Sequence, residues 1–196
     1  MPTGKLVLAA ILGGLAMFIW GAVSHMALPL YNGSLQKFTD QDAVLQVISA
    51  NAQKSGTYFL PNIPDLAATA SNEEKEAAEK AMMEKSEHGP SMFAFVRVGE
   101  LGSWTPLLIV EYVSNALAVL VLAWLLLKTG VTKFGDRVTA AVCVGVLVIL
   151  SETVSQANWY SAGMGFTIAE TVDQVVGWFA AGLVMAKILP KAQMQI

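Results

Sequence analysis

The chain has 196 residues, of which 55% are hydrophobic and 14% are charged, and its formal net charge at neutral pH is −3. A soluble domain carries charge on about a quarter of its residues. This composition, with a mean hydropathy of +0.54, therefore indicates a membrane protein and excludes an ordinary soluble domain. The small net charge gives no reason to expect a nucleic-acid partner.

Four apolar runs are long enough to cross a bilayer, which takes about 20 residues of helix. They are Leu6–Leu28, Leu107–Leu127, Val138–Ala157 and Thr167–Leu189. The first run is too long for the apolar part of a cleavable signal peptide, and no small-residue cleavage site follows it. We therefore expect it to be a retained span.

Small residues in the first run predict close helix packing. Ala10 and Gly14 are four residues apart, a spacing that lets a neighbouring helix approach. In a regular α-helix Gly21 and His25 continue the same face. The sequence therefore predicts that His25 points toward neighbouring helices and away from lipid.

The hydrophilic region between the first two runs contains both helix and strand signals. Asp40 is a candidate helix cap, and Ser71 with Glu74 forms a candidate capping box for a second helix. The expected elements are helices from Asp40 to about Lys54 and from Ser71 to about Lys85, and strands at Gly56–Leu60 and Met92–Val98. We therefore predict a small α+β cap domain in which the two strands pair.

The predicted fold is an all-α transmembrane four-helix bundle with this α+β domain inserted between helices 1 and 2. Its parts are span 1 at residues 1–28, the cap at 29–104, and spans 2–4 at 105–196. The basic residues that flank the spans all fall on one side; they are Lys5, Lys128, Lys133, Arg137, Lys187 and Lys191. Because basic loops stay in the cytoplasm, we expect cytoplasmic termini and an extracytoplasmic, periplasmic cap, in a bacterial inner (plasma) membrane.

The signature Glu-x-Val-x-Asn/Gln occurs three times in the apolar runs. The copies are Glu111–Asn115, Glu152–Gln156 and Glu170–Gln174. Residues four apart share a helix face, so each copy presents a carboxylate and an amide in one direction. With the predicted topology, these glutamates, Asp173 and His25 lie within roughly 5 to 10 Å of the outer side of the bilayer. We expect them to converge in one polar cluster.

Three interpretations of this cluster compete, because ionisable residues within spans usually face a bundle interior, where they pair or serve ions. In the first, the acids bond between helices together with Asn115, Gln156, Asp173 and Gln174, and hold a scaffold together. The second is a divalent metal site with His25, Glu111, Glu152 and Glu170 as ligands. The third is a proton or cation path, which the lack of acids at the inner ends of the spans disfavours.

The functional hypothesis follows from the motifs. The sequence has no Gly-rich phosphate loop, no nucleophile elbow and no HExxH. We expect a non-catalytic membrane subunit or scaffold, surrounded by lipid, whose cap docks another membrane subunit or an extracytoplasmic protein. The alternatives are a metal-binding membrane protein or metal-dependent membrane enzyme, and a component of proton or cation translocation. The sequence names no substrate.

Overall fold

The computed structural model describes residues 3–190, so the predicted flanking residue Lys191 lies outside the described part of the chain. Four helices in this part are long and apolar enough to cross a membrane. They are Thr3–Ala27, Thr105–Lys128, Phe134–Tyr160 and Met164–Ile188. The four predicted spans are therefore confirmed, and their apolar surfaces indicate a membrane protein in contact with lipid.

Two of the four spans contain a π-helical turn. In the first, α1 (Thr3–Ala22) continues into η1 (Val23–Ala27). In the third, α5 (Phe134–Val148) leads through η2 (Ile149–Thr153) into α6 (Val154–Tyr160). The second and fourth spans are the uninterrupted helices α4 (Thr105–Lys128) and α7 (Met164–Ile188). A π-helical turn holds one residue more than an α-helical turn, so it changes which residues share a face beyond it.

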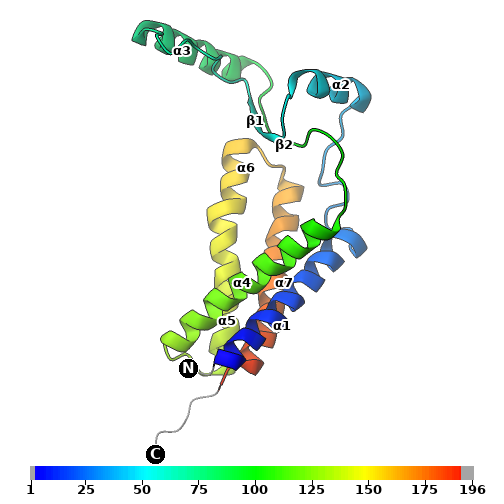
Figure 1. The fold of residues 1–196 in the computed structure, drawn as a ribbon, viewed down its shortest axis with the longest axis vertical. Helices are drawn as coiled ribbons and strands as arrows, with labels where there is room; N and C mark the ends of the chain where they lie inside the picture. The colour runs from blue at the N-terminus through cyan, green and yellow to red at the C-terminus, as the bar shows by residue number, and fades with distance from the viewer. Residues whose placement is uncertain (1–2, 191–196) are drawn as a thin grey trace, which may run out of the picture. The chain divides into compact units, whose positions relative to one another are not determined.

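Helix α1 packs against both α4 and α7, and α7 packs against α5 as well (Figure 1). Glycines permit these approaches. A Cβ atom at Gly14 would lie 2.5 Å from the Cα atom of Ala116, and one at Gly182 would lie 2.7 Å from the Cβ atom of Ala141. The small residues in the first span therefore bring α1 into backbone contact with α4, as their spacing predicts.

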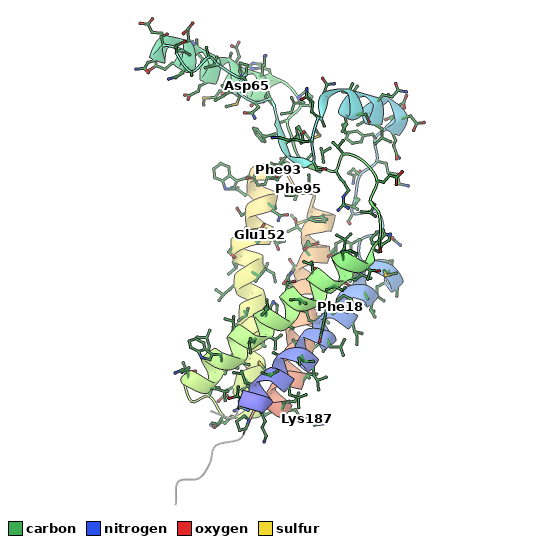
Figure 2. The ribbon with its side chains drawn as sticks, viewed as in Figure 1. Phe18, Asp65, Phe93, Phe95, Glu152 and Lys187 are labelled. Carbon is green, nitrogen blue, oxygen red and sulfur yellow. The ribbon has the colours of Figure 1, made fainter. Side chains whose placement is uncertain are left out.

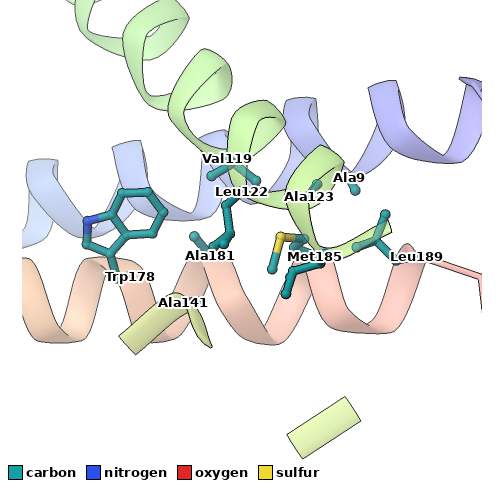
Figure 3. Close-up of a cluster of buried hydrophobic side chains, with 10 residues drawn as sticks. Ala9, Val119, Leu122, Ala123, Ala141, Trp178, Ala181, Met185 and Leu189 are labelled. Carbon is teal, nitrogen blue, oxygen red and sulfur yellow. The ribbon is translucent and has the colours of Figure 1, made fainter. Parts of the chain in front are cut away.

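One hydrophobic core joins all four spans (Figure 3). Its buried members are Ala9, Val119, Leu122, Ala123, Leu126, Ala141, Trp178, Ala181, Met185 and Leu189. Most of them lie in the half of each span that is nearer to the basic residues, which are Lys5, Lys128 and Lys187. The spans are therefore held together mainly at that end, which we call the basic end.

Arg137 caps the last turn of α7 at the basic end. Its side chain is 1% exposed. Nε donates to the carbonyl oxygen of Val131 at 2.9 Å, and Nη2 donates to that of Pro190 at 2.6 Å. Nη1 donates to the carbonyl oxygens of Ala186 at 3.4 Å and Leu189 at 3.0 Å. The last carbonyls of a helix lack backbone donors and carry partial negative charge. The guanidinium therefore satisfies the end of α7 and ties it to the start of α5.

Residues Lys37–Leu101 form a separate unit, whereas the chain up to Gln36 belongs with the spans. The boundary thus falls eight residues after the predicted limit of span 1 at residue 28. Its elements are α2 (Gln41–Asn51), β1 (Gly56–Leu60), α3 (Asn72–His88) and β2 (Met92–Val96). Strand β1 pairs antiparallel with β2, as predicted, with Gly56 opposite Val96.

Both predicted helix caps in this unit are present. The Asp40 carboxylate accepts from the backbone N–H of Ala43 at 2.9 Å, and Ser71 and Glu74 bond reciprocally as a capping box. In the third span, helix α5 begins after Lys133 and has Asp136 within its first turn.

The Lys37–Leu101 unit has almost no core of its own. Among its described residues only Ala52 is buried, at 6% exposure. A two-stranded sheet is marginally stable without further packing. The predicted elements are therefore present, but the unit does not bury the apolar side chains that a self-sufficient domain would bury.

Candidate functional site

The π-helical turn in the third span moves Glu152 off the face that the sequence predicts for it. Ala141, Gly145 and Ile149 are buried, and an uninterrupted α-helix would continue this face to Glu152. The extra residue in η2 instead brings Thr153 to the buried position, at 6% exposure, and leaves Glu152 exposed. The predicted inward direction of Glu152 is therefore wrong.

The first span ends in the other π-helical turn, η1. The backbone N–H of Leu28 donates to the carbonyl oxygen of Val23, five residues earlier, at 2.9 Å. Ser24 takes the buried position, at 0% exposure, and His25 is exposed. His25 therefore does not occupy the interior position predicted from the Ala10–Gly14 face.

Two of the three signature copies form the expected pairs, but on exposed faces. Asn115 Nδ2 donates to Glu111 Oε1 at 3.1 Å, and Gln156 Nε2 donates to Glu152 Oε1 at 2.8 Å. Each amide thus lies beside its carboxylate, as the four-residue spacing predicts. Both glutamates are exposed, Glu111 on α4 and Glu152 on η2.

The third copy belongs to a polar cluster that contains a residue the sequence did not single out. Tyr31 Oη donates to Glu170 Oε1 at 2.8 Å. The Tyr31 ring stacks on His25, with 4.4 Å between ring centroids and 26° between planes. Phe166 meets Tyr31 edge-on at 6.2 Å. Tyr31 therefore connects the end of the first span to α7.

We define the Tyr31 cluster as Trp20, Ser24, His25, Tyr31, Glu170 and Asp173. Trp20 Nε1 donates to the backbone carbonyl oxygen of Asp173 at 3.1 Å. Asp173 Oδ1 is buried and has no hydrogen-bond partner among the described residues. Gln174 belongs to the same signature. Its backbone carbonyl oxygen would lie 3.1 Å from a Cβ atom added at Gly145. The cluster therefore contains one buried carboxylate oxygen that could accept a further donor.

Burial raises the pKa of the Tyr31 hydroxyl, and the hydrogen bond to Glu170, the charge of Glu170 and the charge of Asp173 raise it further. Each of these effects disfavours a tyrosinate. Tyr31 therefore remains protonated and keeps donating to Glu170 over the physiological pH range.

The hydrogen bonds around His25 define its tautomer. Ser24 Oγ donates to the carbonyl oxygen of Gly21 at 3.0 Å. His25 Nδ1 lies 3.0 Å from Ser24 Oγ and 3.1 Å from the same Gly21 oxygen. The carbonyl oxygen of Gly21 can only accept, so its contact with Nδ1 is a hydrogen bond only when Nδ1 carries the proton. The tautomer with the proton on Nδ1 and Nε2 as the acceptor therefore satisfies this contact.

The four predicted metal ligands do not come together. Among residues 3–190, no three His, Cys, Asp or Glu side chains lie close enough to hold a metal ion. His25 and Glu170 both contact Tyr31, but Glu111 and Glu152 lie exposed on other helices. The predicted convergence of the three signature copies is therefore not observed, and the metal site has no support in the described part of the chain.

The fold and this cluster place the chain in a broad class, that of mostly helical membrane proteins. It has four candidate spans and a polar insertion after the first span. No family model matches the chain, and neither curated proteins nor solved structures give a match. The function must therefore be argued from the molecule's own residues.

Titration tests the Tyr31 cluster. We expect Tyr31 to ionise well above its ordinary pKa of 10.0 while the protein is folded. Because the folded-state pKa is raised, the stabilising effect is fully present below pH 10.0 and is lost as the pH rises further. The tyrosinate absorbance of the detergent-solubilised protein, minus that of Tyr31→Phe, isolates this hydroxyl. A Tyr58→Phe variant is the control, and an ordinary midpoint for Tyr31 would contradict the geometry.

Proposed function

We propose that the protein is a non-catalytic subunit or scaffold of a membrane complex, and that its Lys37–Leu101 unit docks a protein partner outside the bilayer. The proposal is based on the apolar surface of this unit, which is exposed. The positive-inside pattern of the flanking residues supports an extracytoplasmic position for this unit.

One face of the β1–β2 sheet is aromatic. Phe59 lies opposite Phe93 in the register, and Phe95 follows two residues later on the same face. The Phe93 and Phe95 rings meet edge-on with centroids 5.3 Å apart. Both residues are labelled in Figure 2. Phe95 is 81% exposed and Phe59 is 41% exposed. We call Phe59, Phe93 and Phe95 the aromatic face.

Exposure of such side chains is energetically unfavourable. Full burial of a phenylalanine side chain contributes roughly 1.5–3 kcal/mol. Contiguous exposed apolar surface usually marks an interaction site, and aromatic residues are enriched in protein interfaces. A partner that covers the aromatic face would therefore gain binding energy and would also supply the packing that the unit itself lacks.

Photocrosslinking in native membranes tests the proposal. A photoreactive phenylalanine analogue placed at Phe95 is expected to give a discrete protein adduct, whereas the same analogue at Lys80 on α3 should give none. Adducts with lipid alone would show that the aromatic face rests on the membrane and would contradict a protein partner.

A second measurement addresses the complex itself. In mild detergent, the chain from native membranes should migrate with a partner in fixed ratio, and Phe95→Ser should release it. Met83→Ser is the matched control, because Met83 is also apolar and is 60% exposed, but lies on α3. A wild-type chain that is isolated alone and monodisperse would count against the proposal.

A further inference from the structure

Two carboxylate–amide pairs lie exposed well inside the spans. Glu111 is six residues from the start of α4, or about 9 Å along the helix, and Glu152 is eight residues before the end of α6, or about 12 Å. Apolar side chains surround them: Val110 is 67% exposed beside Glu111, and Leu150 is 62% exposed near Glu152. Such faces meet hydrocarbon unless another helix covers them, and a carboxylate there is costly.

The amides within the chain satisfy these carboxylates only in part. Asn115 and Gln156 each donate to one oxygen, Oε1, of the neighbouring glutamate. A carboxylate has two oxygens and about four acceptor positions. Each pair therefore has capacity for a donor from outside the chain.

The distribution of charge shows which occupant can supply that donor. The basic residues of the spans lie at the opposite end from the two glutamates; they are Lys5, Lys128, Arg137 and Lys187. Figure 2 shows Lys187 and Glu152 toward different ends of the bundle. A second copy inserted in the same direction would place acid beside acid. In the described spans the one basic residue of that half is His25, whose ring is stacked on Tyr31.

We propose that the Glu111–Asn115 and Glu152–Gln156 faces bind transmembrane helices of a different chain that carry a lysine or arginine at the same depth. An ion pair between such side chains is strong in a low-dielectric surrounding. The amide holds the carboxylate in place, and the exposed apolar residues on either side pack against the incoming helix. This inference is independent of what the aromatic face docks.

Designed helices test this chemistry with the full-length protein in phosphatidylcholine vesicles. The probe is a labelled Leu/Ala peptide of about 22 residues with one lysine placed about 9 Å from the end that corresponds to the start of α4. One comparison peptide has methionine at that position, and another has its lysine near the opposite end. Energy transfer to the labelled protein should show about tenfold tighter association for the first peptide.

Variants identify the faces involved. Glu111→Gln and Glu152→Gln should each reduce the preference for the lysine peptide, and the double variant should abolish it. Glu100→Gln, which removes an acid outside the spans, is the control and should change nothing. Equal association of all three peptides would overturn the inference. A disulfide between two copies of the protein that carry Glu111→Cys and Cys143→Ser would also overturn the inference. It would show that a second copy of this chain covers the Glu111 face.

Discussion

Substitution of Gly14 by alanine is expected to lower the free energy of unfolding by about 3 kcal/mol, the upper range for overpacking a tight contact. A Cβ atom at this position would lie 2.5 Å from the Cα atom and 2.6 Å from the backbone N atom of Ala116. Backbone atoms cannot move aside as the tip of a side chain can. Helices α1 and α4 would therefore have to separate, with loss of packing in the core beside them.

Unfolding of the protein by sodium dodecyl sulfate in mixed micelles, followed by circular dichroism, measures this effect. Gly21→Ala in the same helix is the control, because a Cβ atom at Gly21 would have no described atom within 4 Å. Alanine favours a helix over glycine by about 1 kcal/mol, so the control should be neutral or slightly stabilised. Equal behaviour of the two variants would show that α1 and α4 are not in backbone contact.

Loss of the Arg137 guanidinium is expected to have a comparable effect. Hydrogen bonds that involve a charged group contribute about 1.5–3 kcal/mol each. Arg137→Met keeps an unbranched apolar stem but leaves the carbonyls of Leu189 and Pro190 without this donor. Because water can replace part of the lost bonding at the helix end, we expect a net destabilisation of about 3 kcal/mol.

The matched control for this prediction is Lys133→Met, which removes an exposed basic residue directly before α5. It should change stability by less than about 0.5 kcal/mol. Arg137→Lys should recover only part of the loss, since one ammonium cannot reproduce a planar fork of donors. If Arg137→Met and Lys133→Met were equally mild, the cap on α7 would not contribute to stability.

Local chemistry made much of the fold predictable. The apolar runs gave the four spans because a span must bury about 20 residues in hydrocarbon. Asp40 and Ser71 marked helix starts because their side chains accept from the first free backbone N–H groups. Strand Gly56–Leu60 was predicted with its observed bounds, since Pro61 follows it directly.

The candidate site was less predictable because it depends on helix register. The four-residue spacing correctly paired Glu111 with Asn115 and Glu152 with Gln156, which is a local property. The direction of Glu152 required knowledge of the π-helical turn η2, which nothing in the local sequence distinguishes from α-helix. The direction of Glu111, on the uninterrupted helix α4, depends on how the helices pack. Tyr31 was missed because it lies in the connection after the first span, where its contacts with Glu170 depend on tertiary packing.

The turn η2 also shows how the third span accommodates its length. If one residue before Thr153 were removed and the span were a regular α-helix, Thr153 would lie on the same side as Ala141 and Gly145. The π-helical turn η2 thus takes up one surplus residue within the span. The third span therefore accommodates one residue more than a regular helix with the same buried side would hold up to Thr153, and the extra residue leaves Glu152 exposed.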